Sequence, residues 1–213
     1  MPMAKTPAQQ KRSQYLASVR ARGASGNNLW FVSPPQDTQS LPLTLCSDIE
    51  LDTFFYLEGS PDLASIDYAP LRHGQAPSRP GRRHFATVTT LEGTELDVEL
   101  APEADKASVA GRRLISLAVL DAGKVRIESW RAIVPTINRC RSHSLGPVII
   151  RCRHLLEEHG ELTVRALCQQ LVTESTALVT GALATLLRAR EIQSDVDTHL
   201  WGPGTALRAH RHG

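Results

Sequence analysis

A β-hairpin predicted between residues 84 and 100 constrains the fold of this chain more than any other feature. Along residues 95–100, apolar and acidic side chains alternate strictly: Leu96, Val98 and Leu100 against Glu95, Asp97 and Glu99. Such alternation places apolar side chains on one face of a strand and charged side chains on the other. Glu92-Gly93 separates this strand from the preceding stretch 84–90. We therefore expect two antiparallel strands joined by a tight turn.

The segments around the hairpin predict a compact α/β domain over residues 28–135. Short strands are expected near 29–32 and 41–45, followed by a helix with Ser47 as N-cap and Glu50 completing a capping box. Gly59 ends that helix, a strand follows at 66–70, and the Gly- and Pro-containing segment 73–81 is a loop. After the hairpin, residues 104–121 have a helical or mixed pattern, and 125–130 is predicted to be a strand.

Beyond Pro135 the apolar spacing becomes helical. Three helices are expected, over 146–159, 163–171 and about 175–190, and two strands around a turn over 192–208. Three helices followed by a hairpin are typical of a winged helix, so residues 136–213 are predicted to form a winged-helix domain. Residues 1–27 are polar and basic and are interpreted as an N-terminal arm; an ordinary solvated terminus is the alternative.

Composition narrows the class of protein. With 213 residues, 41% of them hydrophobic and 22% charged, the chain is long enough for two small domains and is not disordered overall. No apolar run approaches the length of a membrane span, and the start lacks the apolar core of a secretory signal, so a cytoplasmic protein without a membrane partner is expected. The four cysteines form no Cys-x-x-Cys pair, which argues against a zinc site.

The formal net charge of +2 conceals an uneven distribution along the chain. Residues 1–45 contain five basic side chains against one acidic, residues 46–135 ten against fourteen, and residues 136–213 nine against seven. This pattern suggests segments with different tasks. Arginine supplies 20 of the 24 cations and suits phosphate recognition, although a GC-rich genome would also favour arginine.

Several short signatures, in this order, resemble the TnsA endonuclease family of transposons. They are the Ile49-Glu50 helix, Ser60-Pro61-Asp62, the strand at 66–70, Asp97-Val98-Glu99, the segment 128–134, which resembles the family's last strand, and the segment 186–192 followed by Asp195. The resemblance covers residues 28–208 and implies a restriction-endonuclease-like mixed sheet followed by a winged helix. In that family a helix Glu, the Asp of a Pro-Asp-Phe strand and an acid-x-Lys strand bind a divalent metal.

The sequence departs from the family at the positions that hold the metal. Glu50 matches the helix Glu, but Glu99 stands in place of the Lys, and no acidic residue occurs between Tyr68 and Leu91. Arg82 and Arg83 occupy the place of the central Asp. We therefore treat Glu50, Asp97 and Glu99 as residual catalytic positions. No resident metal or cofactor is expected, since Mg²⁺ is required only if the chain is an active nuclease.

Three functional hypotheses remain open at this point. The favoured one is a TnsA-like DNA-binding subunit of a transposition complex that no longer cleaves, with double-stranded DNA, a DDE-type transposase and an AAA+ ATPase regulator as partners. The second is a stand-alone winged-helix regulator. The third is an active Mg²⁺-dependent endonuclease acting at transposon ends. Asp97 and Glu99 also fit the solvated face of an ordinary hairpin.

The predicted DNA-binding residues come from the arm, the arginine-rich stretch and the winged helix. They are Lys11, Arg12, Arg20, Arg82, Arg83, Arg151, Arg153, Thr176, Thr180 and Arg188. The third helix of the C-terminal domain is poor in the Arg, Lys, Asn and Gln residues that usually read bases. A protein-docking role for that helix is therefore an equal alternative, and the arginines also fit a solvated surface.

Overall fold

The computed structural model describes residues 17, 28–35, 42–68, 83–101 and 111–210. Within these residues the chain forms six helices and three small sheets, a mixed α/β architecture. The predicted arm, apart from Ala17, and the loop at 73–81 lie outside the described residues. So do four predicted DNA-binding residues: Lys11, Arg12, Arg20 and Arg82.

The first described elements agree with the sequence prediction. Strands β1 (Trp30–Val32) and β2 (Leu43–Leu45) pair antiparallel. Helix α2 (Asp48–Glu58) begins after its N-cap Ser47, whose hydroxyl accepts the backbone N–H of Glu50 at 3.2 Å. Gly59 ends this helix.

A four-stranded sheet follows, built from β3 (Leu63–Asp67), β4 (Arg83–Thr90), β5 (Glu95–Leu100) and β6 (Arg112–Ile115) in that order. β3, β4 and β5 run antiparallel, and β6 pairs parallel to β5. The predicted hairpin is thus confirmed as β4–β5. Its turn contains Gly93 with φ of 83°, a left-handed conformation that glycine adopts without steric cost. β3 starts earlier than expected, at Leu63 instead of residue 66.

The prediction of a strand at 125–130 was wrong, because this segment belongs to the long helix α5 (Lys124–Cys140). The segment 128–134, which was expected to be the last strand of an endonuclease-like sheet, lies in the same helix. Buried apolar side chains recur every three or four residues over its whole length: Ile127, Trp130, Ile133, Val134 and Ile137. A six-residue window sees too little of that period to separate helix from strand. The segment expected to be helical or mixed contains β6 and then the short helix α4 (Leu117–Ala122).

The C-terminal elements follow the predicted order closely. They are α6 (Gly146–His159), β7 (Glu161–Thr163), α7 (Val164–Gln170), α8 (Thr176–Arg188), β8 (Ile192–Ser194) and β9 (Ala206–Ala209). Thr163 and Ser175 cap α7 and α8 with their hydroxyls. The three strands form a sheet in the order β7-β9-β8, with both pairings antiparallel.

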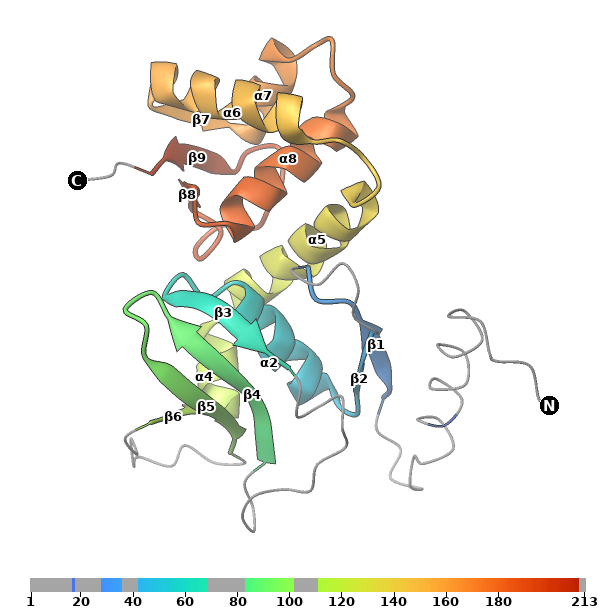
Figure 1. Ribbon diagram of the computed structural model, residues 1–213, viewed down its shortest axis with the longest axis vertical. Helices are drawn as coiled ribbons and strands as arrows, with labels where there is room; N and C mark the ends of the chain where they lie inside the picture. Colours follow the sequence, from blue (N-terminus) through green and yellow to red (C-terminus); the bar gives the residue numbers. More distant parts are fainter. Residues whose placement is uncertain (1–16, 18–27, 36–41, 69–82, 102–110, 211–213) are drawn as a thin grey trace, which may run out of the picture.

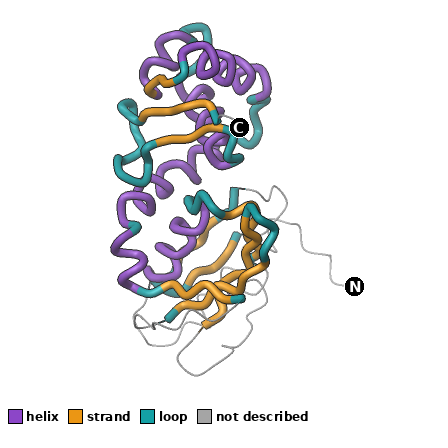
Figure 2. Tube along the Cα trace, turned by 90° about the vertical axis from the view of Figure 1, so that its left-hand side faces the viewer, coloured by secondary structure: helices purple, strands orange, loops and turns teal. Residues whose placement is uncertain are grey.

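Helix α5 joins the two ends of the molecule. Figures 1 and 2 show the sheet part, which contains α2, α4 and β3–β6, at one end, and the helical part, α6–α8 with β7–β9, at the other. α5 packs against both α2 and α8, so the predicted boundary at residue 135 lies inside a continuous helix. One cluster of buried apolar side chains extends from Leu43 to Leu207 through both parts. None of the helices described combines the length and apolar character needed to cross a bilayer.

Candidate nucleic-acid interface and the predicted catalytic positions

Asp97, one of the three predicted catalytic positions, lies on the face of the four-stranded sheet opposite the buried Val98. Its Oδ1 is 3.2 Å from His84 Nε2 and 3.3 Å from Thr87 Oγ1, which donates to it. The Asp97 side chain remains 52% exposed. This carboxylate is therefore accessible, and its neighbours on β4 are a histidine and a threonine.

Glu99 shares that face of β5 but is buried, with 2% of its surface exposed. Arg112 on the neighbouring strand β6 places Nη1 3.3 Å from Glu99 Oε1. A buried carboxylate depends on such a cationic partner, because the loss of water around the charge is costly. Glu99 is thus engaged in an ion pair within the sheet.

Glu50 is also buried, with 1% exposed, at the start of α2. Its Oε2 accepts the backbone N–H of Cys46 at 2.6 Å, which ties the residue before the N-cap Ser47 to the first turn of the helix. An acidic side chain near a helix N-terminus is favoured by the helix dipole. Among the described residues, no group of three or more His, Cys, Asp or Glu side chains is placed to hold a metal ion. Glu50, Asp97 and Glu99 are therefore not gathered into one site.

Two of the predicted DNA-binding arginines on α6 are paired with carboxylates. Arg151 forms an ion pair with Glu174, and Arg153 forms one with Glu191. Both arginine side chains are 43% exposed. Arg83 begins β4, where its backbone pairs with Leu100.

Helix α8, the predicted recognition helix, is covered by α5, α6 and α7 over most of its length. Gly181 lies so close to Cys140 of α5 that a Cβ at this position would collide with the Cys140 side chain. Thr176 is exposed at the first turn, and Thr180 is half-buried with its hydroxyl donating to Thr176 O at 2.7 Å. The geometry thus leaves only the start of α8 accessible.

Arg188, predicted to bind DNA, is instead buried, with 8% exposed. Its Nε donates to Glu58 Oε2 at 2.7 Å, and Tyr68 donates its hydroxyl to Glu58 Oε1 at 3.0 Å. Burial raises the pKa of the Tyr68 phenol, and the neighbouring Glu58 charge raises it further. Sequence reasoning placed Arg188 at the surface because its partner Glu58 stands 130 residues earlier in the chain.

Arg190 adds a second connection between the two parts. Its guanidinium donates to the main-chain oxygens of Glu58 (3.3 Å) and Ser60, and Nη1 donates to Leu187 O at 3.4 Å. It also lies over the Trp130 ring, 5.7 Å from the centroid. Sequence reasoning did not single out Glu58, Tyr68 or Arg190. The only sign in the sequence was that two arginines, Arg188 and Arg190, directly follow the leucines expected to be buried.

Three other arginines of the C-terminal region are exposed and lack such pairing. In the described part of the chain, no carboxylate lies within ion-pair distance of Arg139 or Arg165. Arg141 donates to the main-chain oxygen of Pro34. Arg139 and Arg141 at the end of α5 and Arg165 at the start of α7 are thus exposed cations that could contact an anionic partner.

No protein-family model matches the chain. A comparison with curated protein sequences likewise gives no significant match.

Proposed function

We propose that this chain is a DNA-binding subunit of a transposition complex, TnsA-like in architecture, that binds DNA without cleaving it. The order of helices and strands in each of the two parts of the chain supports the proposal. Helix α2 followed by β3, β4 and β5 matches the helix, strand and hairpin on which the resemblance to a restriction-endonuclease-like domain rests, whereas the segment 128–134, its expected last strand, lies in helix α5. The sequence α6-β7-α7-α8-β8-β9, with three antiparallel strands, is the order expected for a winged helix.

The proposal that the chain does not cleave DNA is supported by the contacts of the two buried acids, Glu50 and Glu99. Glu99 Oε1 forms an ion pair with Arg112, and Glu50 Oε2 accepts the backbone N–H of Cys46. Metal-dependent phosphodiester cleavage requires carboxylates that converge on the ion and remain free to bind it. In this proposal the sheet part supports binding, and the acids stabilise the fold.

The same geometry favours a complex subunit over a stand-alone winged-helix regulator. A regulator of that type inserts its recognition helix into the major groove. Here α8 is covered by three other helices, and Arg188 is paired with Glu58. We therefore assign the phosphate contacts to exposed arginines such as Arg139 and Arg165. As protein partners we propose a DDE-type transposase and an AAA+ ATPase. A cytoplasmic location belongs to the same proposal.

Replacing Arg139 and Arg165 together by glutamine is expected to lower the affinity for DNA. The affinity is also expected to fall less steeply as the salt concentration rises. Each lost phosphate contact reduces the slope of log K against log salt by about 0.9, so the double variant is expected to lower its magnitude by about two. The measurement is fluorescence anisotropy of a labelled mixed-sequence duplex titrated at several salt concentrations.

The matched control is the double variant Arg151→Gln and Arg153→Gln, which removes the same net charge from arginines already paired with Glu174 and Glu191. We expect its salt slope to stay close to that of the unaltered protein. Equal effects in the two double variants would contradict the assignment to Arg139 and Arg165. No duplex binding at low salt would contradict the proposed function itself.

A further inference from the structure

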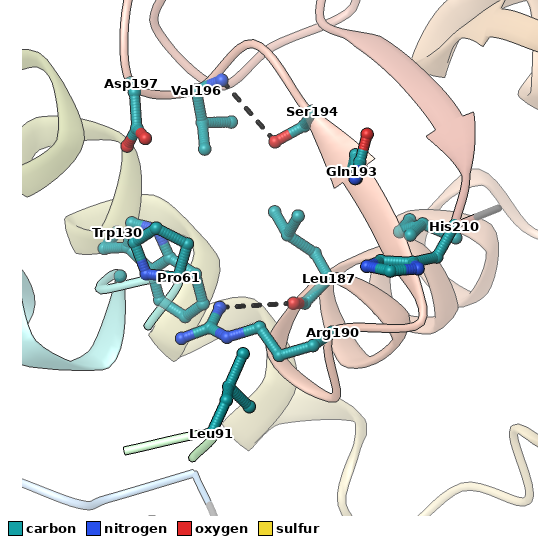
Figure 3. Close-up of a pocket in the computed structure, with 12 residues that line it drawn as sticks. Pro61, Leu91, Trp130, Leu187, Arg190, Gln193, Ser194, Val196, Asp197 and His210 are labelled. Atoms are coloured by element: carbon teal, nitrogen blue, oxygen red, sulfur yellow. Dashed lines mark hydrogen bonds between the residues drawn. The ribbon is translucent and has the colours of Figure 1, made fainter. Parts of the chain in front are cut away.

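The loop between β8 and β9, residues 195–205, corresponds to the wing of the proposed winged helix, and we call it the wing loop. At its start, the backbone N–H of Val196 donates to the Ser194 hydroxyl at 3.5 Å, and the Val196 side chain is buried. Figure 3 shows Val196 and Asp197 above Trp130 of α5, at the pocket that these residues line together. The first residues of the wing loop therefore face α5.

Arg126, in the first half of α5, binds the wing loop through an ion pair. Its Nε donates to Asp197 Oδ1 at 2.5 Å, and its Nη2 donates to Asp197 Oδ2 at 3.0 Å. Two parallel bonds between one guanidinium and one carboxylate fix the orientation of both groups. The Arg126 guanidinium also lies over the Tyr56 ring of α2, 5.3 Å from its centroid. Arg126 thus connects the wing loop to the sheet part.

Ser129, one turn further along α5, binds the backbone of the wing loop. Its hydroxyl donates to the main-chain oxygen of His199 at 3.3 Å and accepts the backbone N–H of Trp201 at 3.1 Å. Ser129 is buried, whereas Leu200, the residue between the two that it contacts, is 64% exposed. One hydroxyl therefore satisfies a donor and an acceptor of the wing loop, and the contact does not depend on the loop's own side chains.

The charges of the wing loop favour α5 over DNA. Residues 195–205, all of them described, contain two aspartates and neither lysine nor arginine. The other titratable side chain is His199, whose Nδ1 is 3.3 Å from Asp195 Oδ2. Phosphate contacts come chiefly from arginine, lysine and neutral donors, and carboxylates repel the phosphate backbone. The wing loop is therefore complementary in charge to Arg126 and not to DNA.

We propose that the wing loop positions the helical part by binding α5 and takes no part in the DNA contacts. Arg126 and Ser129 are the positioning residues on α5. DNA is met instead by the surface that carries Arg139 and Arg165. The exclusion of DNA from the wing loop rests on the proposed function, whereas the binding of the wing loop to α5 does not, and the two are tested separately.

Backbone hydrogen exchange, followed by NMR, tests the contact with α5. Ser129→Ala removes the acceptor of the Trp201 N–H, and we expect this amide to exchange at least about tenfold faster than in the unaltered protein. The amides of β9 are the internal reference and are expected to keep their rates. Ser142→Ala, at an exposed position after α5, is the matched control and is expected to leave the Trp201 amide unchanged. Equal Trp201 rates in the two variants, or an equal rise throughout β9, would overturn the binding of the wing loop to α5.

Two substitutions of Arg126 test the ion pair by the same measurement. Arg126→Gln removes the charge that binds Asp197, and we expect faster exchange of the Trp201 amide than in the unaltered protein. Arg126→Lys keeps a cation at this position and is expected to restore much of the protection. A Trp201 amide that exchanges equally fast in the unaltered protein and in Arg126→Gln would overturn the positioning role of Arg126.

A pair of added carboxylates tests the exclusion of DNA from the wing loop. Leu200→Glu places an acid at the exposed Leu200, and we expect the affinity for the labelled duplex to change by less than about twofold. Gln169→Glu adds the same charge at an exposed position of α7, one turn after Arg165 and on the same face, and is expected to lower the affinity at least about fivefold. Equal effects of the two variants would overturn the exclusion. Absence of duplex binding by the unaltered protein would contradict the proposed function, and the exchange rates alone would then decide the contact with α5.

Discussion

Arg188→Met is expected to lower the free energy of unfolding by about 3–5 kcal/mol. The substitution leaves the Glu58 carboxylate buried, with 1% exposed, and removes the cation that balances it. Tyr68 still donates to Glu58, but one neutral hydrogen bond does not replace an ion pair in a water-excluded site. Equilibrium unfolding in urea, followed by circular dichroism, measures the change.

Two further variants separate charge balance from general damage at this position. The double variant Glu58→Leu and Arg188→Met removes both charges and is expected to recover most of the lost stability, because a buried pair is often replaceable by apolar side chains. Arg208→Met breaks an ion pair with Glu161 in which the arginine is 65% exposed, and it is expected to cost at most about 1 kcal/mol. If Arg188→Met cost no more than Arg208→Met, the Glu58–Arg188 pair would not hold the two parts together.

Gly59→Ala is expected to destabilise the protein by about 1–3 kcal/mol through overpacking. A Cβ at this position would lie 2.5 Å from Trp130 Cδ1 and 2.6 Å from Nε1, and the indole is enclosed by the core. The backbone itself allows alanine, since φ is −86° and ψ is −7°. The clash therefore outweighs the modest gain that alanine brings by restricting the unfolded chain. Unfolding curves monitored by tryptophan fluorescence measure the difference.

Gly146→Ala is the matched control for the same change of residue. No atom lies within 4 Å of a Cβ built at Gly146, which begins α6. We expect its stability to stay within about 0.5 kcal/mol of the unaltered protein. If Gly59→Ala were as stable as Gly146→Ala, the Trp130 side chain could move aside at little cost. The close packing of Gly59 at the end of α2 against Trp130 of α5 would then not limit stability.

Local signals were sufficient for much of the fold. The β4–β5 hairpin followed from alternation and from Gly93, α2 from its cap Ser47, and α7 and α8 from their helical apolar spacing. Each of these features depends on residues within a few positions of one another. Helix α5 was missed at its start because apolar residues at 125, 127 and 130 fit a strand as well as a helix over so short a window.

The candidate site was less predictable because its contacts are distant in sequence. The pairing of Glu99 with Arg112 depends on β6 lying parallel to β5, and that strand carries no distinct pattern of its own. The burial of Arg188 depends on α8 packing against α5, which brings it to Glu58. A surface role for Arg188 was the natural expectation from charge alone, and only the tertiary fold excludes it.

A plasmid-cleavage assay tests most directly whether the chain binds DNA without cutting it. Supercoiled plasmid is incubated with the protein in Mg²⁺ or Mn²⁺ at concentrations that saturate duplex binding in the anisotropy titration. Glu50→Ala and the exposed-site variant Asp97→Asn serve as controls. The bound plasmid is expected to stay supercoiled, with no difference between the unaltered protein and either variant. Metal-dependent nicking by the unaltered protein that is lost in Glu50→Ala and Asp97→Asn would contradict it.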